Sequence, residues 1–137
     1  MKKIADGFIL VVLCIFLFVG CQNEIIQNMN FENIANAIKI EVNHFYFGEE
    51  TNWTIEDSEA INEAANWLNT FTLNKFSFPE DESPEKNENR ESFCFVVYDA
   101  QSNTTEFCYV IDEIGNCYIR YQSQWYTVEN PSMPTFI

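Results

Sequence analysis

The chain has 137 residues, of which 21 are acidic and 7 are basic, so its formal net charge is −14 at pH 7. A surface this acidic repels phosphate backbones and anionic lipid headgroups, which excludes nucleic acid and a peripheral basic membrane contact as expected partners. The length suits one domain that buries its core without a structural metal.

The first twenty-one residues are organised like a secretory leader. Lys2-Lys3 precedes an apolar run from Phe8 to Val19, which is shorter than the roughly twenty residues that a membrane span needs. Gly20-Cys21 follows the run. We expect residues 1–20 to be a signal peptide. A plain membrane anchor and cleavage without lipid are the alternatives.

The segment Phe18-Val19-Gly20-Cys21 resembles the bacterial lipobox, although Phe18 stands where Leu is usual. The resemblance implies cleavage before Cys21, attachment of diacylglycerol to its sulfur, and further acylation, for example with palmitate. Two or three acyl chains anchor a protein stably where a single chain is marginal. The expected location is therefore the extracytoplasmic face of the cell membrane, with Cys21 as the lipidation site. Removal of the leader, with two lysines and one aspartate, leaves a formal charge of −15.

Residues 21–36 begin polar and rich in asparagine, and we expect them to be the lipidated cysteine and a tether, although Ile25, Ile26 and Met29 could start a short helix. A strand is predicted from Ala37 to Phe47, because Ile38, Ile40 and Val42 alternate with charged and polar residues. Gly48-Glu49-Glu50 is predicted to end this strand.

A helix is predicted from about Asp57 to Asn69. Asp57 can cap the first free amides, and Glu59 favours the positive end of the helix dipole. The apolar residues recur at helical spacing and form one stripe, and they are Ile61, Ala64, Ala65, Leu68 and Phe71.

Residues 77–91 hold two prolines and many charges, so we expect an exposed acidic loop. Four antiparallel strands in a meander are predicted after it, at residues 93–98, 107–111, 117–121 and 124–128. Residues 131–137 contain two prolines that end ordered pairing, and we expect them to be a tail.

The predicted fold class is therefore α+β, with one helix packed on one face of an antiparallel sheet. The predicted order is β-α-β-β-β-β after the N-terminal signal peptide. One domain, residues 37–130, would hold the whole core, and no internal repeat is visible.

Besides the lipobox, the chain has the helix start Thr54–Asp57, the segment Trp67–Asn69, the strand Phe93–Asp99 and the closing strands Ile119–Tyr121 and Trp125–Val128. In these features it resembles a loose group of small Gram-positive bacterial lipoproteins of unknown function. The resemblance implies a location and a fold but no activity. The element order is also similar to the cystatin fold, which includes protease inhibitors. The Gln-x-Val-x-Gly loop of those inhibitors is absent, and fold analogy without the site is a weak argument.

Three cysteines remain beyond the leader and Cys21, namely Cys94, Cys108 and Cys117. At most one disulfide can form among three thiols. Cys94 and Cys108 fall on the two arms of a predicted hairpin, where a disulfide could join them in an oxidising compartment. Buried free thiols are the interpretation that we favour. The spacing lacks the close Cys-x-x-Cys pair of zinc sites, so we expect no metal.

His44 is the only histidine, so a Ser-His-Asp or Cys-His catalytic arrangement would require it. It falls on the same predicted strand face as Ile40 and Val42, where a hydrogen-bonded core or edge histidine is the usual role. The four glycines are scattered and form no phosphate-binding loop. The acidic loop lacks the spacing of a calcium-binding loop. We therefore expect neither catalytic residues nor a cofactor.

Aromatic residues are more numerous than a small core requires, and they include Phe45, Phe47, Trp53, Trp67, Trp125 and Tyr126. Core packing is the usual explanation, and an exposed platform for a sugar, peptide or partner protein is the alternative. We expect a non-catalytic binding or accessory module of the cell envelope, with an envelope protein as partner. The alternative is a surface inhibitor or immunity-type protein that binds a basic enzyme or toxin. An acidic patch on loop 77–91 would favour that alternative, and an aromatic cleft between helix and sheet would favour a small ligand.

Overall fold

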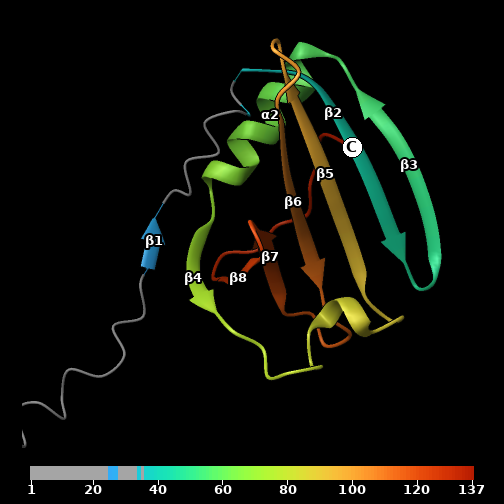
Figure 1. Ribbon diagram of the computed structural model, residues 1–137, viewed down its shortest axis with the longest axis vertical. Helices are drawn as coiled ribbons and strands as arrows, with labels where there is room; N and C mark the ends of the chain where they lie inside the picture. The colour runs from blue at the N-terminus through green and yellow to red at the C-terminus, as the bar shows by residue number, and fades with distance from the viewer. Residues whose placement is uncertain (1–24, 28–33, 35) are drawn as a thin grey trace, which may run out of the picture.

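The computed structural model describes residues 25–27, 34 and 36–137, so the predicted signal peptide and Cys21 lie outside the described residues. One antiparallel sheet and one α-helix make up the domain (Figure 1), which confirms the α+β class. The elements in chain order are β1 (Ile25–Gln27), β2 (Ala37–Tyr46), β3 (Glu49–Ile55), α2 (Ser58–Asn69), β4 (Thr72–Phe76), the short 3₁₀ helix η1 (Pro84–Lys86), β5 (Glu91–Asp99), β6 (Thr104–Ile111), β7 (Cys117–Tyr121) and β8 (Gln124–Val128).

The strands lie side by side in the order β1-β4-β8-β7-β6-β5-β2-β3, and all the pairs are antiparallel. The predicted meander is confirmed as β5 to β8. The predicted element order is wrong, because β3 precedes the helix and β4 follows it. The first four residues of β3 are exposed, so the strand has little of the apolar alternation that identifies a half-buried strand.

The hairpin of β2 and β3 is closed by a two-residue turn at Phe47 and Gly48. Both residues have positive φ, 47° and 87°, which is the type I′ geometry that matches the twist of antiparallel strands. The turn ends β2 as predicted, but Glu49 and Glu50 begin β3 instead of a loop.

The helix agrees closely with its predicted bounds. The Asp57 side chain accepts hydrogen bonds from the backbone N–H groups of Glu59 and Ala60, at 3.1 and 3.0 Å. Four helix residues are buried against the sheet, namely Ile61, Ala64, Trp67 and Leu68. The core therefore lies between α2 and one face of the sheet, as the apolar stripe predicts.

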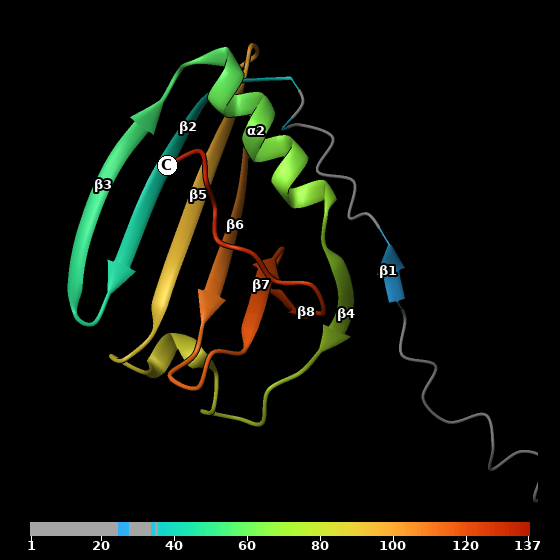
Figure 2. The same ribbon diagram turned by 180° about the vertical axis from the view of Figure 1, so that it is seen from behind.

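The C-terminal tail also packs on the helix side of the sheet (Figure 2). The indole N–H of Trp67 donates to the carbonyl oxygen of Ser132 at 3.1 Å. Pro134 is buried, and the Phe136 ring packs 5.5 Å from the ring of Trp67. Part of the predicted tether belongs to the fold as well, since β1 pairs with β4 and Ile34 is buried.

Loop 77–90 covers part of the opposite face of the sheet, which we call the outer face (Figure 1). Pro84 is buried, and the Phe78 ring packs against the rings of Tyr118 and Trp125 at 5.0 and 5.2 Å. The loop is exposed at most positions, as expected, but Phe78 and Pro84 are exceptions. The prolines and charges of this segment correctly predicted a loop. The side chains of Phe78 and Pro84 fasten it to the sheet.

Candidate functional site

The space between the helix and the sheet is filled with aromatic rings. The Trp67 ring lies 4.9 Å from Phe71, 5.1 Å from Tyr109 and 6.0 Å from Phe95. Phe136 covers this group from the tail. The aromatic cleft that would favour a small ligand is thus occupied by the protein's own side chains.

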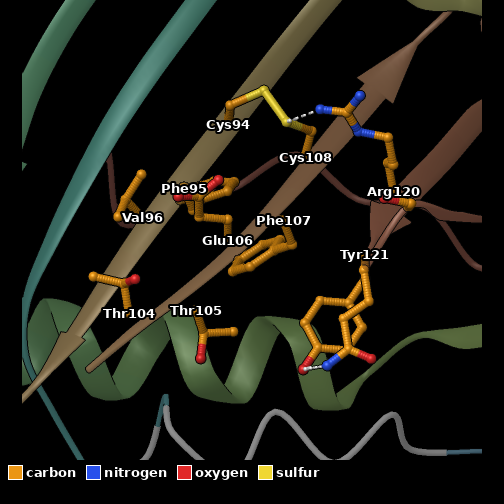
Figure 3. A pocket seen from close by; sticks show the side chains of 12 residues that line it. Cys94, Phe95, Val96, Thr104, Thr105, Glu106, Phe107, Cys108, Arg120 and Tyr121 are labelled. Atoms are coloured by element: carbon orange, nitrogen blue, oxygen red, sulfur yellow. Dashed lines mark hydrogen bonds between the residues drawn. A yellow bond between two sulfur atoms is a disulfide. The ribbon is translucent and has the colours of Figure 1, made fainter.

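The outer face carries two adjoining hollows, which we together call the outer hollow. One, of about 430 Å³, lies over β5, β6 and β7, and its lining includes Thr104, Glu106 and Arg120 (Figure 3). The other, of about 380 Å³, lies over β2, β3 and β5. Both are lined by Cys94 and Val96, so the two hollows adjoin at β5.

A disulfide between Cys94 and Cys108 lies in the middle of the outer hollow (Figure 3). The two residues are directly opposite each other in the register of β5 and β6, with Cα atoms 4.1 Å apart. This distance is characteristic of a non-hydrogen-bonded pair, where facing side chains approach most closely. The disulfide differs from the pair of free thiols that the sequence favoured. Cys117 is the free cysteine among the described residues.

Arg120 borders the hollow and is held on two sides. Its Nη1 donates to Oε2 of Glu85 at 2.8 Å, and its Nη2 lies 3.9 Å from the sulfur of Cys108. The guanidinium carbon is also 6.0 Å from the centre of the Trp125 ring. Because Glu85 belongs to loop 77–90, this ion pair fastens the loop beside the hollow. The negative charge of Glu85 also offsets the positive charge of Arg120.

Glu41 supplies a negative charge at the β2 end of the hollow. Its carboxylate accepts from Nζ of Lys39 at 2.7 Å and from the hydroxyl of Tyr98 at 2.8 Å. The hydrogen bond from Lys39, followed by that from Tyr98, holds the pKa of Glu41 below its usual value. The carboxylate is therefore fixed in its charged form at neutral pH.

His44 lies on the same sheet face as Ile40 and Val42, as predicted, and so faces away from the outer hollow. Its Nε2 is 2.9 Å from Oε1 of Glu91, and its ring stacks on Phe93 at 4.3 Å. The histidine is therefore hydrogen-bonded and stacked, as expected for a structural residue at the border of the core.

The aromatic residues that suggested a platform are distributed over both faces. Trp67 and Tyr126 are buried in the core, and Trp53 packs against it. Trp125 lies under loop 77–90, whereas Phe47 at the hairpin turn is 58% exposed. They do not form one continuous surface, and core packing explains three of the six.

The acidic side chains of loop 77–90 are partly engaged within the protein. Glu85 pairs with Arg120, and Asp81 accepts from Lys86. No group of three His, Cys, Asp or Glu side chains in the described ranges is placed to hold a metal ion. None of the helices in the described part of the chain is long and apolar enough to cross a membrane.

Comparisons with family models, curated proteins and solved structures found no match to this chain. The fold and the site define the protein as a single antiparallel sheet with one helix on one face and a shallow, disulfide-containing hollow on the other. The disulfide pair was among the candidate residues from the sequence. Arg120 and Glu41 were missed, because single charged residues on alternating strands carry no sequence motif.

Proposed function

We propose that this chain is a non-catalytic binding module of the cell envelope, held at the extracytoplasmic face of the cell membrane by a lipid on Cys21. The lipobox-like segment Phe18–Cys21 supports the anchor. The disulfide between Cys94 and Cys108 carries the proposal, because disulfides persist in oxidising compartments and are rare in the cytosol. An extracytoplasmic location accounts for both features.

Ligand binding is assigned to the outer hollow, because the helix side is filled by the protein's own aromatic residues. Val96 and the disulfide supply an apolar floor, and the rim carries polar side chains, a combination typical of ligand sites. Glu106 adds negative charge, whereas the charges of Glu41 and Arg120 are already paired with Lys39 and Glu85. The hollow therefore suits ligand groups that are polar and either uncharged or positively charged.

A shallow hollow is compatible with a useful interaction when the protein is tethered. Confinement to the membrane raises the effective concentration of the module near other envelope proteins. A modest intrinsic affinity then suffices, and the asparagine-rich residues 21–24 and 28–33 supply part of the chain between the proposed anchor and the domain.

Cross-linking on intact cells, followed by capture and mass spectrometry, tests this function. The native chain should recover one dominant envelope protein, and the Cys21→Ser chain should lose both membrane association and that partner. Thr104→Arg, which fills the hollow, should reduce the recovery several-fold, whereas Gln101→Arg adds the same charge at an exposed turn residue outside it. Equal capture by the native and Cys21→Ser chains would refute the tethered module, and equal capture by both arginine variants would refute the site.

A further inference from the structure

β3 forms an open edge of the sheet (Figure 1). It pairs with β2 through seven consecutive residue pairs without a register shift, and no other strand of the described ranges pairs with it. The opposite end of the sheet differs, because β1 covers β4 there. An open, regular edge strand is a template for an additional strand, since half of its backbone groups point outward.

The hairpin turn determines which backbone groups of β3 point outward. In a two-residue type I′ hairpin, the residues flanking the turn, here Tyr46 and Glu49, exchange both backbone hydrogen bonds. The amide of the next residue, Phe47, donates in the opposite direction, to the carbonyl oxygen of Arg90 on the β5 side at 3.4 Å. Successive backbone groups at this end of β2 therefore point alternately to β3 and to β5, as expected for a central strand.

Hydrogen-bonded and non-hydrogen-bonded pairs alternate along the hairpin. The backbone N–H and C=O groups directed at β2 therefore belong to Glu49, Thr51, Trp53 and Ile55. The groups directed away from β2, into the open edge, belong to Glu50, Asn52 and Thr54. These three residues are all exposed, so no side chain in the described part of the chain covers them.

β3 itself carries only negative charge, while the guanidinium of Arg90 lies 4.0 Å from the centre of the Phe45 ring on the neighbouring strand β2. Between Lys39 and Lys75 the chain contains seven acidic residues and no lysine or arginine. Two of the seven, Glu49 and Glu50, are exposed at the start of β3. A second copy of this chain would bring like charge to the edge, whereas a basic segment would be attracted to it.

Two exposed aromatic rings lie beside these glutamates. Tyr46 and Phe47 are 51% and 58% exposed, and their ring centres are 4.7 Å apart. Lysine and arginine side chains bind favourably over aromatic faces, so the rings add a second attraction for the same chemistry.

We propose that the β3 edge receives an extended, basic segment of a partner protein as an additional strand. This inference rests on the proposed role as a binding module and names the chemistry of its partner. Backbone hydrogen bonds to Glu50, Asn52 and Thr54 supply affinity, as in other cases of strand addition. Two adjacent lysine or arginine residues lie opposite Glu49 and Glu50, one on each face of the sheet. An apolar residue three positions further from the turn lies opposite Trp53.

The test uses the purified full-length chain in a non-ionic detergent and end-capped peptides of seven residues, the length of β3. There are two probes, one with Lys-Lys at its N-terminus and one with Lys-Lys at its C-terminus, so that parallel and antiparallel strand pairing are both covered. In each probe valine lies three positions beyond the lysine pair, and the other residues are threonine. A peptide with Glu-Glu in place of Lys-Lys is the control. Amide hydrogen exchange should slow at Asn52 and Thr54 when a lysine peptide binds, and should be unchanged at Thr51 and Trp53. Those two amides are already bonded to β2, so they serve as the internal control.

Two variants separate the backbone contribution from the charge contribution. Asn52→Pro removes an outward N–H without removing a hydrogen bond to β2, so it should weaken lysine-peptide binding by at least about tenfold, while Asn52→Ala should bind normally. Glu49→Gln combined with Glu50→Gln leaves the backbone intact and should weaken binding by about 3- to 10-fold. The double variant remains informative if the proline variant fails to fold.

Equal binding of the Lys-Lys and Glu-Glu peptides would overturn the proposal, and so would binding without protection of the Asn52 and Thr54 amides. Absence of binding by either lysine peptide would also overturn it. These results do not depend on lipidation, so they are separate from the Cys21 test of the proposed function. Loss of the partner from intact cells in the Cys21→Ser chain would uphold the tethered module even if the peptides failed to bind.

Discussion

Cys94 and Cys108 occupy directly opposite positions on β5 and β6 and are joined by a disulfide. The bond is short-range in sequence, with a separation of 14 residues, and lies on the outer face instead of in the core. It ties the two strands that form the floor of the outer hollow. The same disulfide therefore shapes the floor of the outer hollow and supports an oxidising, extracytoplasmic location for the protein.

Removal of the disulfide should destabilise the domain. A crosslink that closes a loop of this size contributes about 3 kcal/mol in the chain-entropy model. Cys94→Ala combined with Cys108→Ala should therefore lower the free energy of unfolding in urea by about 2–4 kcal/mol. Cys117→Ala, which removes a thiol that is not bridged, is the matched control. A double variant as stable as the native chain would show that the disulfide does not constrain the domain.

The C-terminal tail should stabilise the domain through Phe136. Its ring packs on Trp67 and lies 6.1 Å from the ring of Phe95. Phe136→Ala should cost about 1–2 kcal/mol of unfolding free energy and shift tryptophan emission to longer wavelength, because water reaches Trp67. Thr135→Ala, at the neighbouring exposed position, should change neither quantity. Unchanged emission in the Phe136 variant would place the tail elsewhere in solution.

Asp99 should contribute a pH-dependent stability. Its carboxylate accepts from the side chain and backbone of Asn103 and from the backbone of Gln101, which holds its pKa below the usual 3.8. The unfolded state therefore binds a proton at higher pH than the folded state. The stabilisation is fully present above the unfolded pKa and is lost as the pH falls through the folded pKa.

The Asp99→Asn variant should accordingly be less stable than the native chain at pH 6, and the difference should shrink below about pH 4. Urea denaturation followed by circular dichroism between pH 3 and 7 measures it. Glu113→Gln, at an exposed turn residue, controls for the loss of one negative charge. A difference that is constant with pH would mean that the hydrogen bonds of Asp99 do not persist in solution.

Cys117 should react slowly in the folded protein. Burial raises the pKa of its thiol, and the charge of Asp112 adds to the effect. Because the unfolded state loses this proton first, stability should fall as the pH rises past the ordinary thiol pKa of about 9. Alkylation by iodoacetamide at pH 8 should be much slower in the folded chain than in urea, without reductant in either case. Equal rates would contradict the half-buried environment of the thiol.

The parts of the fold that the sequence predicted are those with a strong local pattern. The Asp57 cap, the apolar stripe of α2 and the alternation in β2 each reflect one buried face, and a buried face leaves a periodic signature. The meander was predictable because its turns carry small and polar residues. Cys94 and Cys108 could be placed on facing arms for the same reason, although the sequence could not decide their oxidation state.

The features that were missed depend on non-local packing. β3 has little apolar alternation because it is an edge strand, and its one local signal was the Gly48 of a two-residue turn. The loop after β4 folds back because Phe78 packs against Tyr118 and Trp125, which are forty or more residues away in sequence. Pairing of Arg120 with Glu85 follows from that return and has no sequence signature.

We propose that a lipid on Cys21 displays the domain outside the cytoplasm. Mass spectrometry of the chain extracted from its native cells, with thiols blocked before lysis, tests this proposal. We expect residues 1–20 to be absent, the N-terminal peptide to begin at Cys21 and carry diacylglycerol, and Cys94 and Cys108 to be oxidised. A chain that retains residues 1–20, with an unmodified Cys21 and reduced Cys94 and Cys108, would contradict it.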